Sequence, residues 1–303
     1  MPRRSISLPP AVSGQRRDLP TQEGRLSYYT AAPIAAGDAR PLLLIHSINA
    51  AGSAYEIKPL YEHYRQTRPV YALELPGFGF SDRLDEEYTA RRMTDAVRAM
   101  VDEIARRHGG MTVDALALSL SSEFLARAAV EIPQAFHSLA LISPSGFSRR
   151  GPRYDPPGST RGRPGFLRFV KAPLVNWLLY RLLTTRPSIR YFLRRTWGSA
   201  DIDEGLAEYD FLTARQPGAR HAPYYFVSGF LFSGDIGSVY DRLTMPVWLI
   251  HGVRGDFVDY TFAEGVDKRP NWSRVILQTG ALPHFERPTE FLSAYDAFLA
   301  RQS

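Results

Sequence analysis

Residues 113–132, VDALALSLSSEFLARAAVEI, decide the fold of this chain. The run 113–118 is mainly apolar, which is typical of a strand buried on both faces of a sheet. The stretch 121–132 has a helix-like pattern, so Ser119 falls on the short turn between the strand and the helix. A sharp turn in this position presents a serine oxygen above the end of a sheet, where a neighbouring base can activate it.

The residues around Ser119 indicate which serine occupies the turn. The positions two before and two after such a serine come close together, and here they are the small residues Ala117 and Ser121. The usual pattern has glycine at both positions. Centring the turn on Ser121 would put the larger Glu123 at the crowded position, so we favour Ser119. The alternative interpretation is a plain serine that caps the following helix.

Similar apolar runs and helix-like stretches continue on both sides of this segment. Alternating strands and helices predict an α/β fold with a mostly parallel central sheet and helices on both faces. The other expected strands are 41–46, 69–74, 138–143, 246–251 and 274–278, and the other expected helices are 55–65, 90–108 and 288–301.

Two further loops carry residues that suit a serine nucleophile. Asp256 follows the expected strand 246–251, and His284 follows the expected strand 274–278. The carboxyl ends of parallel strands meet at one edge of a sheet, where such folds build their sites. The chain order Ser, Asp, His is the order expected for this arrangement. Asp259 is the reserve candidate for the acid.

Together these motifs resemble the α/β-hydrolase superfamily, in its cap-bearing serine hydrolase branch, over nearly all of residues 25–303. The turn His46-Ser47 and the segment 75–82, LPGFGFSD, also match. The resemblance implies that Ser119 attacks the substrate, that His284 transfers the proton and that Asp256 orients the imidazole.

The resemblance also implies an oxyanion hole made by the backbone N–H groups of Leu120 and Ile48. His46 is interpreted as bracing its loop. Asn49, Trp177 and Phe285 are candidates for contacting substrate, although an Asx-turn role suits Asn49 equally well.

The domain organisation follows from where the alternation of strands and helices stops. We expect a loose N-terminal tail at 1–24, a hydrolase core at 25–146 and 244–303, and a helical cap at 147–243, inserted after the sixth strand. The cap sequence is rich in aromatic residues, which would line a pocket for a hydrophobic substrate or would form the core of the cap itself.

Composition narrows the function further. The chain has no cysteine, which excludes disulfides, a thiol nucleophile and cysteine-ligated metal sites. No metal, dinucleotide or phosphate motif occurs, so we expect neither a metal nor a cofactor. No apolar run is long enough to span a membrane.

Segment 147–243 holds 15 Lys and Arg against 8 Asp and Glu. This excess would support a weak peripheral membrane contact or attract an acidic substrate, but a solvated basic face is the commoner explanation.

These observations predict a soluble, cytoplasmic, cofactor-independent serine hydrolase that cleaves an ester or related acyl bond of a hydrophobic small molecule. Nucleic acid is not an expected partner, and the oligomeric state stays open. The same triad would also serve a carbon–carbon bond hydrolase or an acyltransferase. A third alternative is a non-catalytic binding protein of the same fold.

Overall fold

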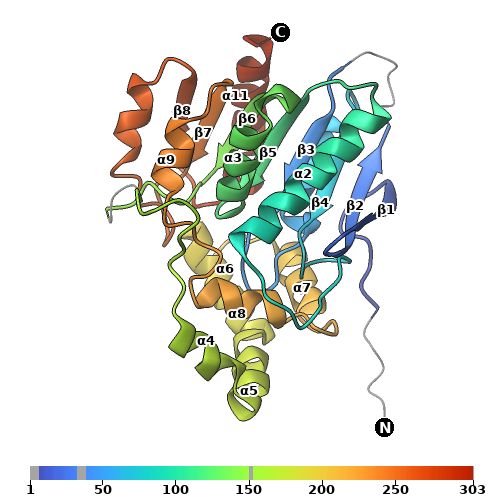
Figure 1. Ribbon diagram of the computed structural model, residues 1–303, viewed down its shortest axis with the longest axis vertical. Coiled ribbons are helices and arrows are strands. Elements are labelled where there is room, and N and C mark those ends of the chain that lie inside the picture. The colour runs from blue at the N-terminus through green and yellow to red at the C-terminus, as the bar shows by residue number, and fades with distance from the viewer. Residues whose placement is uncertain (1–6, 33–38, 150–152, 303) are drawn as a thin grey trace.

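One eight-stranded sheet runs through the molecule in the computed structural model, which describes residues 7–32, 39–149 and 153–302 (Figure 1). The strand order is β1-β2-β4-β3-β5-β6-β7-β8, with β1, β2 and β4 paired antiparallel and all other neighbours parallel. The strands are β1 (Gln15–Thr21), β2 (Gly24–Ala31), β3 (Leu42–Ile45), β4 (Val70–Glu74), β5 (Val113–Leu118), β6 (Phe136–Ile142), β7 (Val247–His251) and β8 (Trp272–Ile276).

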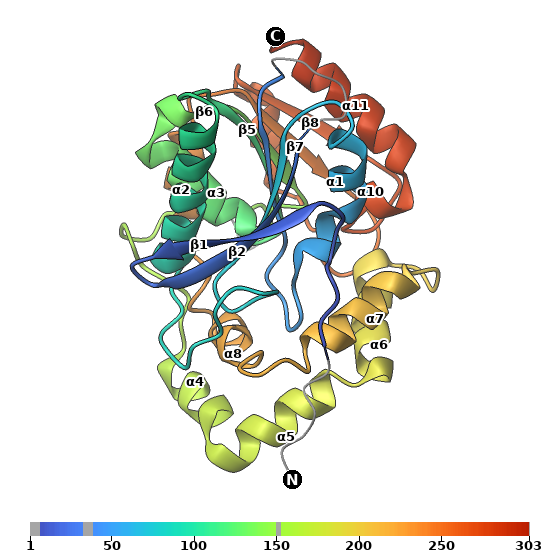
Figure 2. The same ribbon diagram turned by 90° about the vertical axis from the view of Figure 1, so that its right-hand side faces the viewer.

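The central strands are mainly apolar because both of their faces are buried. Successive side chains of a strand point to opposite faces, so Leu43 and Ile45 of β3 join one core cluster while Leu42 and Leu44 join the other. Helices cover both faces and complete these two cores (Figure 2).

The helices divide between the two faces. The first face carries α2 (Ala90–Arg107), α3 (Ser121–Glu131) and α9 (Ile236–Asp241), and the second carries α1 (Lys58–Tyr64), α10 (Pro283–Glu286) and α11 (Pro288–Ala300). The amphipathic pattern of α2 explains its position, since Met93, Val97 and Ile104 are fully buried at helical spacing. Short 3-10 helices lie at Ala54–Ile57 (η1), Pro133–Ala135 (η2) and Ala263–Lys268 (η3).

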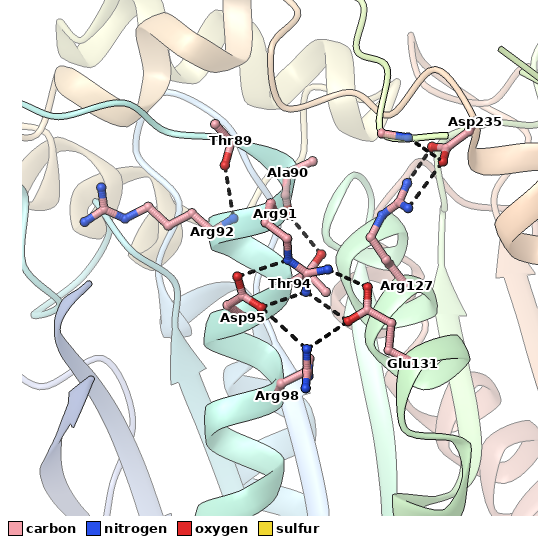
Figure 3. Close-up of polar contacts among 11 residues, drawn as sticks. Thr89, Ala90, Arg91, Arg92, Thr94, Asp95, Arg98, Arg127, Glu131 and Asp235 are labelled. Atoms are coloured by element: carbon pink, nitrogen blue, oxygen red, sulfur yellow. Dashed lines mark hydrogen bonds and ion pairs between the residues drawn. The ribbon is translucent and has the colours of Figure 1, made fainter. Parts of the chain in front are cut away.

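Polar side chains join α2 to α3 on the outer surface (Figure 3). Arg91 and Arg98 of α2 both pair with Glu131 at the end of α3, and Asp95 pairs with both arginines. These side chains are partly exposed, so each pair contributes only about 0–1 kcal/mol. Their main effect is to fix how the two helices lie against each other.

The N-terminal segment is more ordered than the predicted loose tail. β1 pairs with β2 along its whole length, and Leu8 and Val12 pack into the core. β1 is an exposed edge strand with the polar sequence QRRDLPT, and this explains why it resembles a tail in the sequence. Residues 1–6 lie outside the described part of the chain.

The inserted segment between β6 and β7 folds into six helices within its described residues. They are α4 (Pro164–Lys171), α5 (Pro173–Leu183), α6 (Arg186–Trp197), α7 (Glu204–Thr213), α8 (His221–Val227) and α9. Helices α4 to α8 lie beyond the carboxyl ends of the parallel strands, whereas α9 packs on α3 in the core (Figure 1). Across the described residues, none of the helices is both long and apolar enough to cross a membrane.

Candidate active site

Ser119 occupies the turn between β5 and α3 in a strained conformation. Its φ of 52° is in the left-handed region, which serine rarely adopts and which costs of order 1–3 kcal/mol. The Ser119 N–H donates to the Ile142 carbonyl of β6 at 2.8 Å, and its carbonyl accepts from Ser122 at 3.1 Å. These bonds fix the turn. Its hydroxyl makes no hydrogen bond within the described residues, so it is free to meet a ligand.

The flanking positions are fully buried, as a tight turn requires. Ala117 and Ser121 each have no exposed surface. Ser121 does more than fit the space, because its hydroxyl donates to the His46 carbonyl at 2.6 Å. This bond ties the turn to the loop after β3, which carries Ile48.

Ser119 opens into a pocket of about 460 Å³ between the sheet and the inserted segment. This Ser119 pocket has a size typical of small-molecule sites. Its walls are the loop after β6, the start of the inserted segment, the α8 region and the loop after β7. Aromatic side chains among the lining residues are Phe147, Tyr154, Phe226, Phe232, Phe257 and Tyr260.

The two backbone groups predicted for an oxyanion hole are both free. The N–H groups of Ile48 and Leu120 donate to no acceptor within the described part of the chain. Leu120 lines the Ser119 pocket, whereas Ile48 does not. A donor without a partner is the state that an oxyanion hole requires before substrate binds.

Asp256 lines the same pocket but is held by the inserted segment. Its carboxylate accepts from Arg195 Nε at 2.5 Å, and its N–H donates to the Arg195 carbonyl at 3.0 Å. Arg195 lies in the last turn of α6, which ends at Trp197 and is capped by Gly198 with a φ of 60°. Gly255 permits the close approach, because a Cβ there would lie 2.4 Å from the Arg195 carbonyl. The reserve candidate Asp259 is exposed and accepts from Arg149 and Thr261.

His284 lies elsewhere, in α10, and has no exposed surface. Its Nε2 is 2.7 Å from the Glu56 carbonyl. A carbonyl only accepts, so Nε2 carries the proton and donates it. The other ring nitrogen, Nδ1, has no partner among the described residues.

The predicted triad is therefore not assembled in this structure. Ser119 and Asp256 share a pocket that His284 does not line, and Asp256 is bonded to Arg195 instead of to the imidazole. In the loop after β8, Ala281 is the residue that contacts the pocket wall, since its carbonyl accepts from Ser143 Oγ at 2.8 Å. His284 is three residues farther along, where α10 directs its ring toward Glu56.

Burial lowers the pKa of His284 to about 4 from its ordinary 6.5. Between these values the unfolded chain takes up a proton and the folded chain does not, so the free energy of unfolding falls as the pH drops. The slope for one such group is about 1.4 kcal/mol per pH unit. We therefore expect the free energy of unfolding to fall less in the His284→Asn variant than in the wild type when the pH is lowered from about 6.5 to about 4. Urea unfolding at several pH values measures both slopes. Equal slopes would show that His284 is protonated in the folded protein.

Asn49 braces the loop after β3 and does not face the pocket. Its side chain accepts from the Ala51 N–H at 2.7 Å, which is an Asx turn, and donates to Glu56 at 2.5 Å. Glu56 is buried and also accepts from the N–H and hydroxyl of Ser47, and burial raises its pKa. Glu56 thus holds the loop that carries Ile48.

The other two predicted substrate contacts do not reach the pocket in the described residues. Phe285 packs on Trp197 of α6, with ring centroids 5.9 Å apart, and does not line the Ser119 pocket. The side chain of Trp177 lies outside what the structure describes.

The sequence analysis missed a buried acid, Glu123, that joins α3 to the wall of the Ser119 pocket. Glu123 has no exposed surface and pairs with Arg153, which lines the pocket. It also accepts from Ser145 Oγ at 2.5 Å and from the Ser233 N–H at 2.8 Å. The signal in the sequence was a glutamate in the first turn of α3, directly before the apolar pair Phe124-Leu125.

A second strained serine was also missed. Ser143 follows β6 with a φ of 47° and lines the pocket beside Ser119. The turn sequence SPSG at 143–146 was the available signal.

Residues 42–294 match the alpha/beta hydrolase family, which covers most of the chain. The chain belongs to this family. A search of curated protein sequences finds no match. The predicted fold class is confirmed by the family match and by the sheet order, and the prediction of a hydrolase family is confirmed with it.

Solved structures of other family members resemble the chain over almost its whole length. A serine hydrolase involved in carbazole degradation has a TM-score of 0.71 at 16% identity, covering 95% of this chain and 99% of its own. A putative lipase from Acinetobacter baumannii has a TM-score of 0.71 at 19% identity, covering 95% and 91%. An epoxide hydrolase has a TM-score of 0.70 at 19% identity, covering 95% and 99%. At such identities the resemblance concerns the fold alone.

Proposed function

We propose that this alpha/beta hydrolase cleaves an ester or related acyl bond of a hydrophobic small molecule, with Ser119 as the nucleophile. The observation that carries the proposal is the strained Ser119 at the floor of a partly aromatic pocket. Strained residues of this kind cluster at functional sites, where the rest of the structure maintains them. The N–H of Leu120, which lines the pocket, and that of Ile48, on the loop tied to the turn through Ser121, would stabilise the oxyanion that forms when Ser119 Oγ attacks the carbonyl carbon.

The proton of Ser119 needs an acceptor in this reaction. In the proposed scheme His284 takes this role only after its Nε2 leaves the Glu56 carbonyl, and Asp256 orients the ring only after it leaves Arg195. Both changes are needed for turnover at the rate of an ordinary triad.

The contacts of His284 favour a second candidate function. With its Nε2 bonded to Glu56, no imidazole faces Ser119, and the protein would bind a hydrophobic acyl compound with little or no turnover. The same pocket serves both candidates, so they differ in reaction rate and not in ligand class.

The size preference of the pocket tests both candidates. We expect kcat/KM to rise about fourfold per added methylene across a series of esters until the pocket is full, since each buried methylene contributes about 0.8 kcal/mol. For a protein without turnover, the dissociation constants of the matching acids should fall by the same factor per added methylene. Phe232→Ala should flatten the profile, because Phe232 lines the pocket.

Phe285→Ala is the matched control, since this aromatic residue does not line the pocket. It should leave the chain-length profile unchanged. A preference for acetyl groups in the wild type, or a profile that Phe285→Ala flattens and Phe232→Ala does not, would place the ligand elsewhere.

A further inference from the structure

The sequence 156–200 contains nine Lys and Arg and no Asp or Glu. This segment includes helices α4, α5 and α6. Helices α4 and α5 form the end of the molecule opposite the C-terminus, and they project away from the sheet (Figures 1 and 2). Three of these nine basic residues lie on α4 and α5, two directly precede α4, and the other four lie on α6.

The inner side of these two helices packs against the rest of the protein. Val170 of α4 and Tyr180 of α5 are buried in one small cluster. The Tyr180 hydroxyl donates to the Ala50 carbonyl at 2.9 Å, which fixes α5 beside the loop after β3. The position of both helices is thus set by buried contacts.

The outer side exposes large apolar residues to solvent. The apolar end, as we call it, consists of Phe166 and Phe169 of α4, exposed by 42% and 57%, and Leu178 and Leu182 of α5, exposed by 52% and 59%. The two phenylalanines stack with ring centroids 6.3 Å apart, and the two leucines are four residues apart on one helix face. Exposed apolar groups gathered in this way mark an interaction surface.

The basic side chains near the apolar end differ in their partners, since Lys171 of α4 pairs with Asp85. Arg163 and Arg168 are exposed and form no ion pair within the described residues. By contrast, Arg186, Arg190 and Arg195 of α6 each pair with an acid. Arg163 and Arg168 therefore leave uncompensated positive charge at the apolar end.

We propose that α4 and α5 dock this protein on a membrane surface rich in anionic lipids. Exposed aromatic and leucine side chains enter the boundary between headgroups and acyl chains, and arginines beside them bind the lipid phosphates. Arg163 and Arg168, which have no acidic partner within the described residues, suit a negatively charged surface. The docking requires no turnover, so it goes beyond the proposed function and does not depend on it.

Docking would bring the Ser119 pocket close to the bilayer. Arg161 lines the pocket three residues before α4 begins, and α4 packs against α8, which contributes Phe226 to the pocket wall. A hydrophobic substrate dissolved in the membrane would then have a short path to Ser119.

Co-sedimentation of the full chain with vesicles tests the proposal. We expect binding to vesicles of phosphatidylcholine with about one-third phosphatidylglycerol, and little binding to phosphatidylcholine alone. Raising the salt to about 1 M should weaken binding, because it shortens the Debye length to about 3 Å. Arg163→Ala with Arg168→Ala should weaken binding roughly 25-fold, and Phe166→Ala with Phe169→Ala at least about tenfold.

Arg301→Ala and Ile276→Ala are the matched controls, since both residues are exposed and lie on the sheet domain. They should bind like the wild type. The proposal fails if the wild type does not sediment with anionic vesicles, or if the controls lose as much binding as the α4 variants. It also fails if light scattering shows a dimer that Phe166→Ala with Phe169→Ala dissociates, because a second copy would then cover the apolar end.

Discussion

Ser119→Ala should abolish labelling of the protein by a fluorophosphonate probe and should lower any esterase activity by about 10³-fold or more. The probe reacts with a serine oxygen that is exposed in a pocket and stabilised by oxyanion donors. Alanine removes this oxygen while remaining small enough for the turn. Labelling measured by mass spectrometry, and circular dichroism to verify the fold, are the readouts.

Ser143→Ala is the matched control for this prediction. Ser143 also has a positive φ and lines the same pocket, but its hydroxyl donates to the Ala281 carbonyl. It should therefore leave labelling intact, as should Ser121→Ala, whose hydroxyl is bonded to the His46 carbonyl. Loss of labelling in Ser143→Ala with retention in Ser119→Ala would move the nucleophile to the end of β6.

Labelling and turnover together separate the two candidate functions. A protein that is labelled at Ser119 and also hydrolyses esters supports the serine hydrolase. A protein that binds acyl compounds but is neither labelled nor active supports the binding protein, because Ser119 then lacks activation.

The sheet could be predicted from the sequence because burial on both faces imposes a pattern on each strand by itself. The run 113–118 coincides with β5, and the run 246–251 differs from β7 by one residue. The edge strands were harder to predict. The sequence of β1, QRRDLPT, is mostly polar and so resembles a tail, and β8 is displaced by two residues from 274–278.

The candidate site could be predicted only as far as local geometry determines it. The small residues Ala117 and Ser121 on either side of Ser119 predict the strained turn, because its conformation depends on residues close in sequence. The direction of the His284 ring depends on where α10 meets Glu56, a residue 228 positions away. The bonding of Asp256 depends on how α6 ends against the loop after β7, and sequence order gives no information about that contact.

The buried acid of α3 leads to the second large expected effect. Glu123→Ala should lower the free energy of unfolding by about 3–5 kcal/mol, because it leaves the Arg153 guanidinium without its partner at a mostly buried position. Glu123 and Arg127 are four residues apart on α3, and Arg127 pairs in the same way with Asp235 before α9 at 2.5 Å (Figure 3). The helix that follows Ser119 is thus joined twice to the inserted segment, and the Glu123 bond holds the pocket wall.

Glu131→Ala on the same helix is the control for this prediction. Glu131 pairs with Arg91 and Arg98 but is partly exposed, so its loss should cost no more than about 1 kcal/mol. Adding Arg153→Ala to Glu123→Ala should restore part of the stability, because no unpaired charge then remains. Guanidinium unfolding of the four proteins measures these differences. If Glu123→Ala is as mild as Glu131→Ala, the buried Glu123–Arg153 pair does not stabilise the contact between α3 and the wall of the Ser119 pocket.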